Sequence, residues 1–482
     1  MTKLLWEIEN KGRIGVKLPE SDVPQYEPKE ILPDSMVRKS DLRLPQLAEQ
    51  QVVRHFVELS VKNYHLDKSI YPLGSCTMKY NPKLNERLAG QEGFTKIHPL
   101  TPDDYVQGAL KLMKNLGEMM CKIGGLDAIT LQPAAGAHGE ITGLMIIRRY
   151  HESLGNPRKK VIIPDSSHGT NPASIVMSGW QPIEIKSNSD GKIDLNALER
   201  HLDEDLAALM VTNPNTLGIF ESDIKKVAEM LHSVGAQLYM DGANMNALLG
   251  IARPGDFGVD ALHYNLHKTF STPHGGGGPG AGPVAVKSHL EPFIPKPKVI
   301  FKDGKYSLDM ESPKSLGKVQ AFWGAFGVMV KAYAYLLSLG ADGLRRTSED
   351  ALLNSNYLRA ILEKYYDLPY KSIPMHEFVL SGEFLKKYGV KTLDVAKRLL
   401  DLGFHAPTIY FPLIVHEALM IEPTETEPKE TLDAFADAMI QIRNEAENSP
   451  DVLKSAPHDT PVRRLDDVAA NRNPILSWWD VK

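Results

Sequence analysis

Hydrophobic positions between residues 128 and 286 fall into short apolar runs separated by stretches with helical spacing. Short apolar runs bounded by turn residues indicate buried strands. Helix-sized segments between several runs imply crossover connections, so the pattern predicts an α/β unit with a mainly parallel sheet covered on both faces. In such sheets, ligands bind outside the carboxyl ends of the strands. The expected strands are 128–132, 160–164, 182–185, 208–212, 237–241, 261–265 and 283–286.

The pattern differs on either side of this region. Residues 1–90 are irregular and rich in proline at first, with one expected helix at 47–63, and this predicts an extended N-terminal arm. The large domain is then expected over 91–315. Beyond it, residues 316–482 are expected to contain a connecting helix, a small C-terminal α+β domain and a tail; the helices are expected at 326–340, 348–366 and 429–448, and the strands at 376–380, 409–413 and 418–422.

Composition excludes several classes of function. The 55 basic and 60 acidic residues leave a net charge of −5, which gives no basic footprint for nucleic acid or for a membrane surface. Cys76 and Cys121 are the only cysteines, so neither a disulfide framework nor a four-cysteine zinc site is expected, and no metal is predicted. Glu7 and Glu9 interrupt what would be the apolar part of a signal peptide, so we expect a soluble protein of the cytoplasm.

The strongest chemical signal follows the expected strand 261–265. Lys268 lies there in a loop that continues through His274 into the glycines Gly275–Gly278. Glycines let a backbone approach a ligand closely and offer amide donors to a phosphate, and a lysine amine in a partly dry pocket can form an imine. Alone, the segment also fits a flexible loop with an incidental lysine.

The strand 237–241 ends in Asp241, which Gly242, Ala243 and Asn244 follow. A carboxylate held at this place can pair with a pyridinium nitrogen and keep it protonated. Ala243 is small enough to pack beneath an aromatic ring, and Asn244 is a candidate substrate contact. A lone aspartate at a strand end is more often a cap, but its position one strand before Lys268 favours the functional interpretation.

Three further strand ends carry polar or small residues. His168, after strand 160–164, is placed to stack on a cofactor ring, although an ordinary hydrogen-bonding role would also suit a loop histidine. Ala135, Gly136 and Ala137 lead directly into a helix, where free amides and the helix dipole favour a phosphate. Asn213 and Thr216, after strand 208–212, are candidates for contact with a cofactor oxygen or the substrate.

Together, the segments PAAGAHGE, SSHGTNPAS, TNPNTLGIFE, MDGANMNALLG, RPGDFGVDALHYNLHKTFSTPHGGGGPGAGP and PTETE resemble the glycine decarboxylase (P-protein) family of the glycine cleavage system. Within it the chain is similar to subunit 2 of the two-subunit form, over nearly its whole length. The resemblance implies a fold-type-I enzyme of the pyridoxal-phosphate (PLP) class with a Schiff base on Lys268, Asp241 as pyridinium partner and His168 as ring stack. It places the phosphate at Ala135, Gly136 and Ala137.

The implied reaction is the decarboxylation of glycine, with transfer of the aminomethyl group to the lipoyl arm of the carrier H-protein. A partner subunit 1 is implied, in a heterotetramer of two copies of each chain. A channel for the lipoyl arm is expected, and Tyr71, Lys79 and Tyr80 in the loop YPLGSCTMKYNPK are candidates for lining it or for binding the glycine carboxylate. Cys76 in this loop is either redox-sensitive or, as we favour, a tolerated small residue.

Other functions remain open from the residues alone. A PLP-dependent decarboxylase or aminotransferase acting on a larger amino acid is the main rival, although no arginine in the small domain is an evident carboxylate anchor. A cysteine desulfurase would need a nucleophilic cysteine on a late loop, where neither cysteine lies. A catalytically silent partner chain would be expected to lack Lys268 or Asp241, and both are present.

Overall fold

The computed structural model describes residues 2–42, 44–275, 280–477 and 480. The chain divides into two units, the first formed by Met1–His65 together with His458–Lys482 and the second by Leu66–Pro457. We call the second the main unit. The cavity and the chemistry described below lie entirely within it.

The first unit has little regular structure. Its longest helix is α2 (Glu49–Ser60), which confirms the helix expected at 47–63, and its other elements are η1 (Leu5–Glu7), α1 (Pro28–Ile31) and α14 (Asp467–Arg472). Among its described residues, no apolar side chain is buried. Many apolar side chains are instead more than 60% exposed, for example those of Ile14 and Leu18.

A seven-stranded sheet is the centre of the main unit, with strand order β1-β7-β6-β5-β4-β2-β3. Neighbours from β3 to β6 are parallel, whereas β7 runs antiparallel to both β6 and β1, so the predicted mainly parallel sheet is confirmed. Each expected strand forms within two residues of its predicted bounds. The strands are β1 (Ala128–Thr130), β2 (Lys160–Pro164), β3 (Gln181–Ile185), β4 (Leu206–Thr212), β5 (Gln237–Gly242), β6 (Ala261–Tyr264) and β7 (Val284–Val286).

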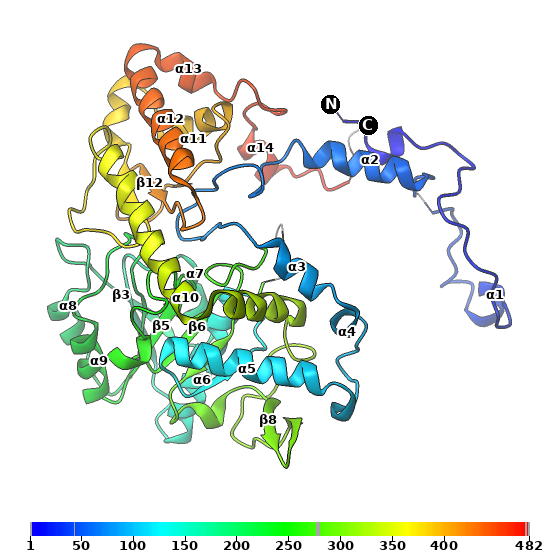
Figure 1. Ribbon diagram of the computed structural model, residues 1–482, viewed down its shortest axis with the longest axis horizontal. Helices are drawn as coiled ribbons and strands as arrows, with labels where there is room; N and C mark the ends of the chain where they lie inside the picture. Colours follow the sequence, from blue (N-terminus) through cyan, green and yellow to red (C-terminus); the bar gives the residue numbers. More distant parts are fainter. Residues whose placement is uncertain (1, 43, 276–279, 478–479, 481–482) are drawn as a thin grey trace. The chain divides into compact units, whose positions relative to one another are not determined.

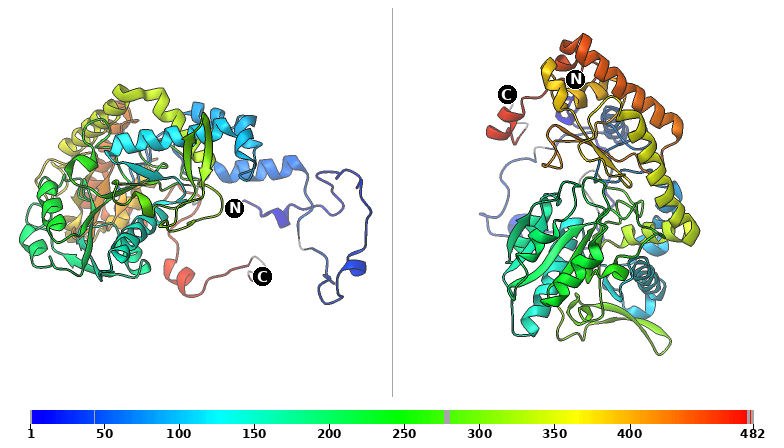
Figure 2. Two further views of the ribbon diagram at one scale, coloured as in Figure 1. Left: turned by 90° about the horizontal axis from the view of Figure 1, so that it is seen from below. Right: turned by 90° about the vertical axis from the view of Figure 1, so that its left-hand side faces the viewer.

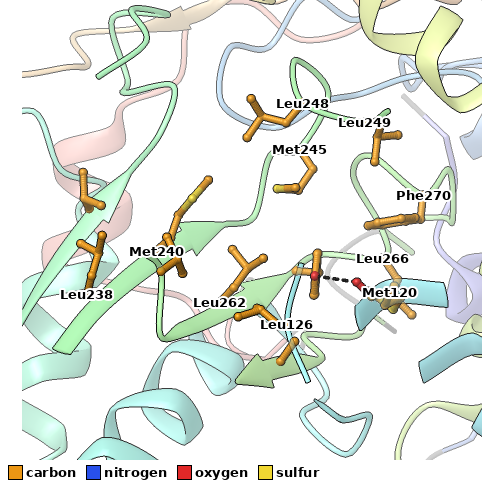
Figure 3. Packing of buried hydrophobic residues seen from close by; sticks show 14 of the residues in the cluster. Met120, Leu126, Leu238, Met240, Met245, Leu248, Leu249, Leu262, Leu266 and Phe270 are labelled. Atoms are coloured by element: carbon orange, nitrogen blue, oxygen red, sulfur yellow. Dashed lines mark hydrogen bonds between the residues drawn. The ribbon is translucent and has the colours of Figure 1, made fainter. Parts of the chain in front are cut away.

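Both faces of this sheet are covered at its central strands β4, β5 and β6, whose side chains are buried at nearly every position rather than at alternate ones. Leu238, Met240 and Leu262 face one side, where they pack with Met120 and Leu126 in the cluster drawn in Figure 3. Tyr239, on the other side, belongs to a second cluster. Fully burying one Leu or Met side chain stabilises the fold by about 1.5–3 kcal/mol, so the two layers hold the strand ends firmly.

Helices cover the two faces as the crossover pattern predicts (Figure 1). Helix α5 contributes to the cluster of Figure 3 and is followed by the C-cap Gly125, whose positive φ of 69° favours glycine. The helices of this region are α3 (Lys83–Ala89), α4 (Glu92–Thr95), α5 (Gln107–Gly124), α6 (Gly136–Ser153), α7 (Thr170–Met177), α8 (Leu195–Glu199) and α9 (Ile224–Ser233). Short 3-10 turns are η2 (Asp103–Tyr105), η3 (Pro254–Phe257) and η4 (Glu291–Phe293).

Helix α10 (Phe326–Leu362) joins this region to the C-terminal part of the main unit. It is two helical segments that meet at Gly340, where φ is 62°, so the two helices expected at 326–340 and 348–366 are joined end to end. The C-terminal part contains a three-stranded antiparallel sheet of order β10-β12-β11, packed with helices (Figure 2, right). Its elements are β10 (Phe378–Ser381), η5 (Glu383–Tyr388), α11 (Thr392–Asp401), β11 (Thr408–Ile409), β12 (Ala418–Ile421), α12 (Lys429–Asn448) and α13 (Pro450–Ser455).

A hairpin of β8 (Lys298–Lys302) and β9 (Lys305–Asp309) was not among the expected elements. Its turn is Asp303-Gly304, with φ of 52° and 79°, which is the signature of a two-residue hairpin loop. The signal was therefore present in the sequence. Across the described ranges, the helices are all too short or too polar to cross a lipid bilayer.

Candidate functional site

A cavity of about 210 Å³ lies at the carboxyl ends of the parallel strands, the place where the sheet topology predicts a ligand. In the sheet register Thr212 pairs with Asp241, and Asp241 pairs with His263, so three polar side chains stand in one row across β4, β5 and β6. The described residues that line the cavity are Ser75, Gly136, Ala137, Glu140, His168, Thr170, Thr212, Pro214, Asp241, Ala243, Asn244, Asn265, His267, Lys268, His376 and Glu377.

Lys268 reaches this cavity from the turn that follows β6. The amide of Lys268 donates to the carbonyl of Asn265 at 3.1 Å, and the amide of Ser271 donates to the carbonyl of Lys268, which closes a tight turn. The Nζ atom donates to the carbonyl oxygen of Ser75 at 2.6 Å. Of the glycines Gly275–Gly278 expected to follow it, only Gly275 is among the described residues.

Asp241, at the end of β5, is buried and held on both oxygens. Oδ1 accepts the amide of Ala243 at 3.0 Å and Oδ2 accepts the Asn171 side chain at 3.1 Å. Nε2 of His263 lies 3.2 Å from Oδ1 but is out of line for a hydrogen bond. Burial acts to raise the pKa of Asp241, but the imidazoles of His263 and His168 and these hydrogen bonds hold the pKa below its ordinary value. The carboxylate is therefore an anion at neutral pH.

His168 lines the same cavity, at the start of the turn that leads into α7. Its Nδ1 lies 2.9 Å from Oγ1 of Thr170, and the Thr170 hydroxyl donates to Glu140 at 2.7 Å. Burial lowers the pKa of His168 below its ordinary value despite the nearby carboxylate of Asp241. A neutral imidazole of fixed orientation is thus available at the cavity wall.

The N-terminus of α6 forms another part of the wall. Ala135 is its extended N-cap and offers no side-chain cap, so the first amides of the helix, beginning with Gly136 and Ala137, have no partner inside the helix. A Cβ atom on Gly136 would lie 2.7 Å from the Asn265 side chain, and one on Gly282 would lie 2.1 Å from the carbonyl oxygen of Ala135. This close packing favours glycine at both positions, and the phosphate site expected at these amides stays a prediction.

The remaining predicted strand-end residues divide into two groups. Ala243 and Asn244 line the cavity, whereas Asn213 and Thr216 are not among its lining residues. The Asn213 side chain accepts from the amide of Glu221, and the Thr216 hydroxyl donates to the carbonyl of Ser166 at 2.6 Å. Their roles as cofactor contacts stay predictions.

The loop YPLGSCTMKYNPK contributes a different residue from those we named. Ser75 lines the cavity, while Lys79 is buried in an ion pair with Glu425 at 2.7 Å. Tyr71 stacks on His405 with ring centroids 3.7 Å apart, and the main-chain carbonyl of Tyr80 accepts from Ser271. The channel and carboxylate roles assigned to Tyr71, Lys79 and Tyr80 stay predictions. Cys76 is a free thiol whose pKa is raised by burial and lowered in part by Lys268.

The structure adds residues that the sequence reasoning did not single out. His376 and Glu377 line the cavity from the C-terminal part of the main unit, and Glu422 is buried within reach of both. A usable signal existed, because Glu377 and Glu422 are charged residues within the otherwise largely apolar runs expected as strands at 376–380 and 418–422. The missing information was that these two strands pair.

Comparisons with known proteins identify the family of this chain. Residues 19–300 match the family model described as glycine cleavage system P-protein, and residues 347–461 match that of the glycine dehydrogenase C-terminal domain. A relative from Caldanaerobacter subterraneus subsp. tengcongensis, named probable glycine dehydrogenase (decarboxylating) subunit 2, is 57% identical over 476 residues, covering 98% of each chain. A relative of the same name from Bacillus licheniformis is 55% identical, again covering 98% of each chain.

Among solved structures, a glycine decarboxylase (P-protein) of the glycine cleavage system in inhibitor-bound form matches with a TM-score of 0.74 at 21% identity, covering 86% of this chain and 93% of that one. The fold is that of the fold-type-I class of PLP enzymes, as the sequence predicted. The chain belongs to the glycine cleavage system P-protein family.

Proposed function

We propose that this chain is the PLP-binding subunit of a glycine decarboxylase, which releases CO2 from glycine and passes the aminomethyl group to a lipoyl carrier. The observation that carries the proposal is that Lys268 and Asp241, at the ends of neighbouring strands, line one cavity. An amine and an anion in this relation suit one pyridoxal ring, because the amine binds its aldehyde and the anion its ring nitrogen. The printed names of the relatives support glycine as the substrate.

The residues of the cavity fit this cofactor. Oγ1 of Thr212 and Oδ1 of Asn265 are buried there without a hydrogen-bond partner among the described residues, and a bound polar ligand would satisfy them. Lys268 would hold the cofactor as an imine, the amides at Gly136 and Ala137 would hold its phosphate, and His168 would cover one face of its ring. When bound, the cofactor supplies a protonated ring that accepts the electron pair of the bond to CO2.

The chain's own residues do the rest of the work. Asp241 would keep the ring nitrogen protonated, because its own pKa is lowered and it remains an anion. Nζ of Lys268, when it is not bonded to the cofactor, would be a free amine able to accept or donate a proton. The cavity side of Ala243 has only a methyl group, which leaves room for a flat ring against it.

Two rival activities have less support. An aminotransferase for larger amino acids needs a fixed cation for the substrate carboxylate, and among the described lining residues there is no arginine and Lys268 is the only lysine. A silent partner chain would have no reason to retain a buried aspartate opposite a cavity lysine.

We also propose that the chain acts with a subunit 1 in a heterotetramer of two of each, and with a lipoyl-bearing H-protein, in the cytoplasm. The words "subunit 2" in the names of the relatives support a partner chain. The exposed apolar residues of the first unit also support a partner protein that covers them, since exposed apolar patches mark interaction sites. Two free thiols are typical of a reducing compartment.

The test is the exchange of labelled CO2 into amino acids, with purified chain, PLP and H-protein, with and without subunit 1. We expect exchange into glycine that requires H-protein and is highest with both subunits. Exchange into a larger amino acid in preference to glycine, or glycine exchange at an undiminished rate without this chain, would contradict the proposal.

A further inference from the structure

Two buried acids face each other at the wall of the cavity. Strands β10 and β12 are antiparallel with Phe378 paired to Ile421, so the next residues outward, Glu377 and Glu422, stand opposite one another. Their side chains are 3% and 0% exposed. Like charges directly opposite on paired strands repel, and burial penalises both charges. Burial, and then the charge of Glu422, raises the pKa of Glu377 well above its ordinary range, and burial raises the pKa of Glu422 to about 7.

The hydrogen bonds decide which acid keeps a proton. Glu422 accepts from the amide of Thr77 at 3.0 Å, from its hydroxyl at 2.8 Å, and from the Asn244 side chain at 3.0 Å on both oxygens. Among the described residues, the one hydrogen bond to the Glu377 carboxyl comes from the amide of Ser75, on Oε2 at 2.6 Å. Donors that bond to a carboxylate stabilise its charged form. Glu422 is therefore the anion of the pair, and Glu377 is the neutral acid with a free oxygen.

His376 stands beside this acid with no partner of its own. It is 1% exposed, and neither ring nitrogen has a hydrogen-bond partner among the described residues. Burial lowers the pKa of His376 to about 3, so the ring is neutral and carries one N–H. Its Nε2 lies 3.7 Å from Oε1 of Glu377, too far for a hydrogen bond. A buried imidazole without a hydrogen-bond partner destabilises the fold unless a bound ligand supplies the missing hydrogen bond.

We infer that His376 and Glu377 form the subsite for the carboxylate of the amino-acid substrate. The inference rests on the proposed function, in which the substrate amine binds at Lys268. In an α-amino acid, one carbon separates the amine from the carboxylate, so the carboxylate must lie next to Nζ. Glu377 is close to Nζ of Lys268 because both side chains bond to Ser75: its carbonyl accepts from Lys268 and its amide donates to Glu377.

Two neutral donors suit a decarboxylase better than a cation does. A salt bridge to arginine would stabilise the substrate carboxylate and would be lost as neutral CO2 forms, which raises the barrier. The O–H of Glu377 and the N–H of His376 orient the carboxylate with less stabilisation of its charge. Together with Glu422, His376 and Glu377 also have the spacing of a cation site. The test distinguishes a carboxylate subsite from a cation site.

The experiment compares glycine with methylamine, which has the amine and lacks the carboxylate. The chain is loaded with PLP and complexed with its partner subunit, and affinities are read from the change in cofactor absorbance. We expect Glu377→Met and His376→Phe each to weaken the affinity for glycine about 10- to 100-fold, which corresponds to the loss of a hydrogen bond to a charged group. The affinity for methylamine should change less than about twofold. Glu377→Gln keeps a neutral donor and should stay within about fivefold of the wild type for glycine.

A matched control is Glu221→Gln. Glu221 is another buried acid whose pKa burial raises, but it binds Asn215 and the amide of Ile193 and does not line the cavity. This variant should leave both affinities unchanged. Melting temperatures of all variants identify any that fail to fold, in which case Glu377→Gln still reports on the subsite.

The pH dependence gives a second readout. Lys268, Cys76, His376 and Glu422 are the charged or titratable groups that act on Glu377 from the surrounding loops and strands. Preference for glycine over methylamine should fall as pH rises through the titration of Glu377. Glu422→Gln removes the repelling charge, so the fall should move to lower pH. An unmoved profile would contradict a neutral Glu377.

Other outcomes overturn the inference. Equal weakening of glycine and methylamine in Glu377→Met and His376→Phe would mean that these side chains only hold the loop at Ser75. Binding of Mn²⁺ to the wild type but not to Glu377→Gln, with no effect on glycine preference, would assign a cation site instead. A wild type that responds to neither amine would refute the proposed function itself, whereas a response to methylamine without preference for glycine would refute only the subsite.

Discussion

Nζ of Lys268 lies 2.6 Å from the carbonyl oxygen of Ser75 and donates a hydrogen bond to it across 193 residues of sequence. The loop that supplies this carbonyl is held by buried acids, since Glu377 accepts from Ser75, Glu422 from Thr77 and Glu425 from Lys79. Any group that bonds covalently to Nζ must take the place of this contact. The loop and the lysine are therefore coupled.

Asp241→Asn should leave the fold intact and impair turnover. The amide has nearly the same shape, but it removes the negative charge that holds a proton on the ring nitrogen. We expect kcat to fall roughly 100-fold or more, the scale for losing one fixed electrostatic group, with a changed cofactor spectrum. Steady-state exchange kinetics and absorbance check this. Unchanged kcat with full PLP occupancy would show that Asp241 does not have this role.

Gly136→Ala should weaken PLP binding. The added methyl group would meet the Asn265 side chain at 2.7 Å and displace the start of α6, where we propose that the phosphate binds. We expect PLP affinity to fall at least about tenfold, which equilibrium dialysis measures. Gly108→Ala is the control, because Gly108 is also helical and a Cβ there would meet nothing within 4 Å. Equal PLP affinity of the two variants would argue against a phosphate site at this helix.

Lys79→Met should destabilise the protein. Lys79 is 1% exposed, and its removal leaves Glu425, whose side chain is 10% exposed, without its charge partner, at a cost of about 3–5 kcal/mol in unfolding free energy. Adding Glu425→Gln should recover most of the loss, because no unpaired charge then remains. Thermal and chemical unfolding check both. A raised KM for glycine at an unchanged melting temperature would instead support Lys79 as a substrate contact.

His151 should make stability depend on pH. Burial lowers its pKa to about 4, from 6.5, although its Nε2 lies 3.0 Å from the carbonyl of Ala207. As pH falls, His151 takes up a proton in the unfolded chain before it does so in the folded one. The contribution of neutral His151 to the free energy of unfolding is therefore complete above about pH 6.5. It is lost as pH falls toward 4, by up to about 1.4 kcal/mol for each pH unit. His151→Phe should reduce the change of melting temperature with pH in this window, and the exposed control His98→Gln should not. A wild type equally stable at pH 4.5 and 7 would contradict this.

The sequence predicted the large sheet closely, because its central strands are buried on both faces and several of them are separated by helices. Lys268, Asp241 and His168 could be assigned to one cavity for the same reason, since the ends of parallel strands meet at one edge. Periodicity carries this information without any knowledge of tertiary contacts.

The C-terminal wall of the cavity could not be predicted in this way. Glu377 and Glu422 are separated by more than 40 residues, and only the pairing of β10 with β12 brings them together. The sequence around Lys79 is typical of an exposed loop that contacts a ligand. In the structure, however, Lys79 is buried, where it pairs with Glu425 and donates to Tyr335. Contacts between distant segments decide such cases, and local patterns do not report them.

The most direct test of the account is reduction of the PLP-loaded protein with borohydride, followed by proteolysis and mass mapping of the pyridoxyl group. We predict a single modified residue, Lys268, and no modification in Lys268→Ala. A pyridoxyl group on another lysine, or none in the wild type, would contradict the central claim that Lys268 forms the imine.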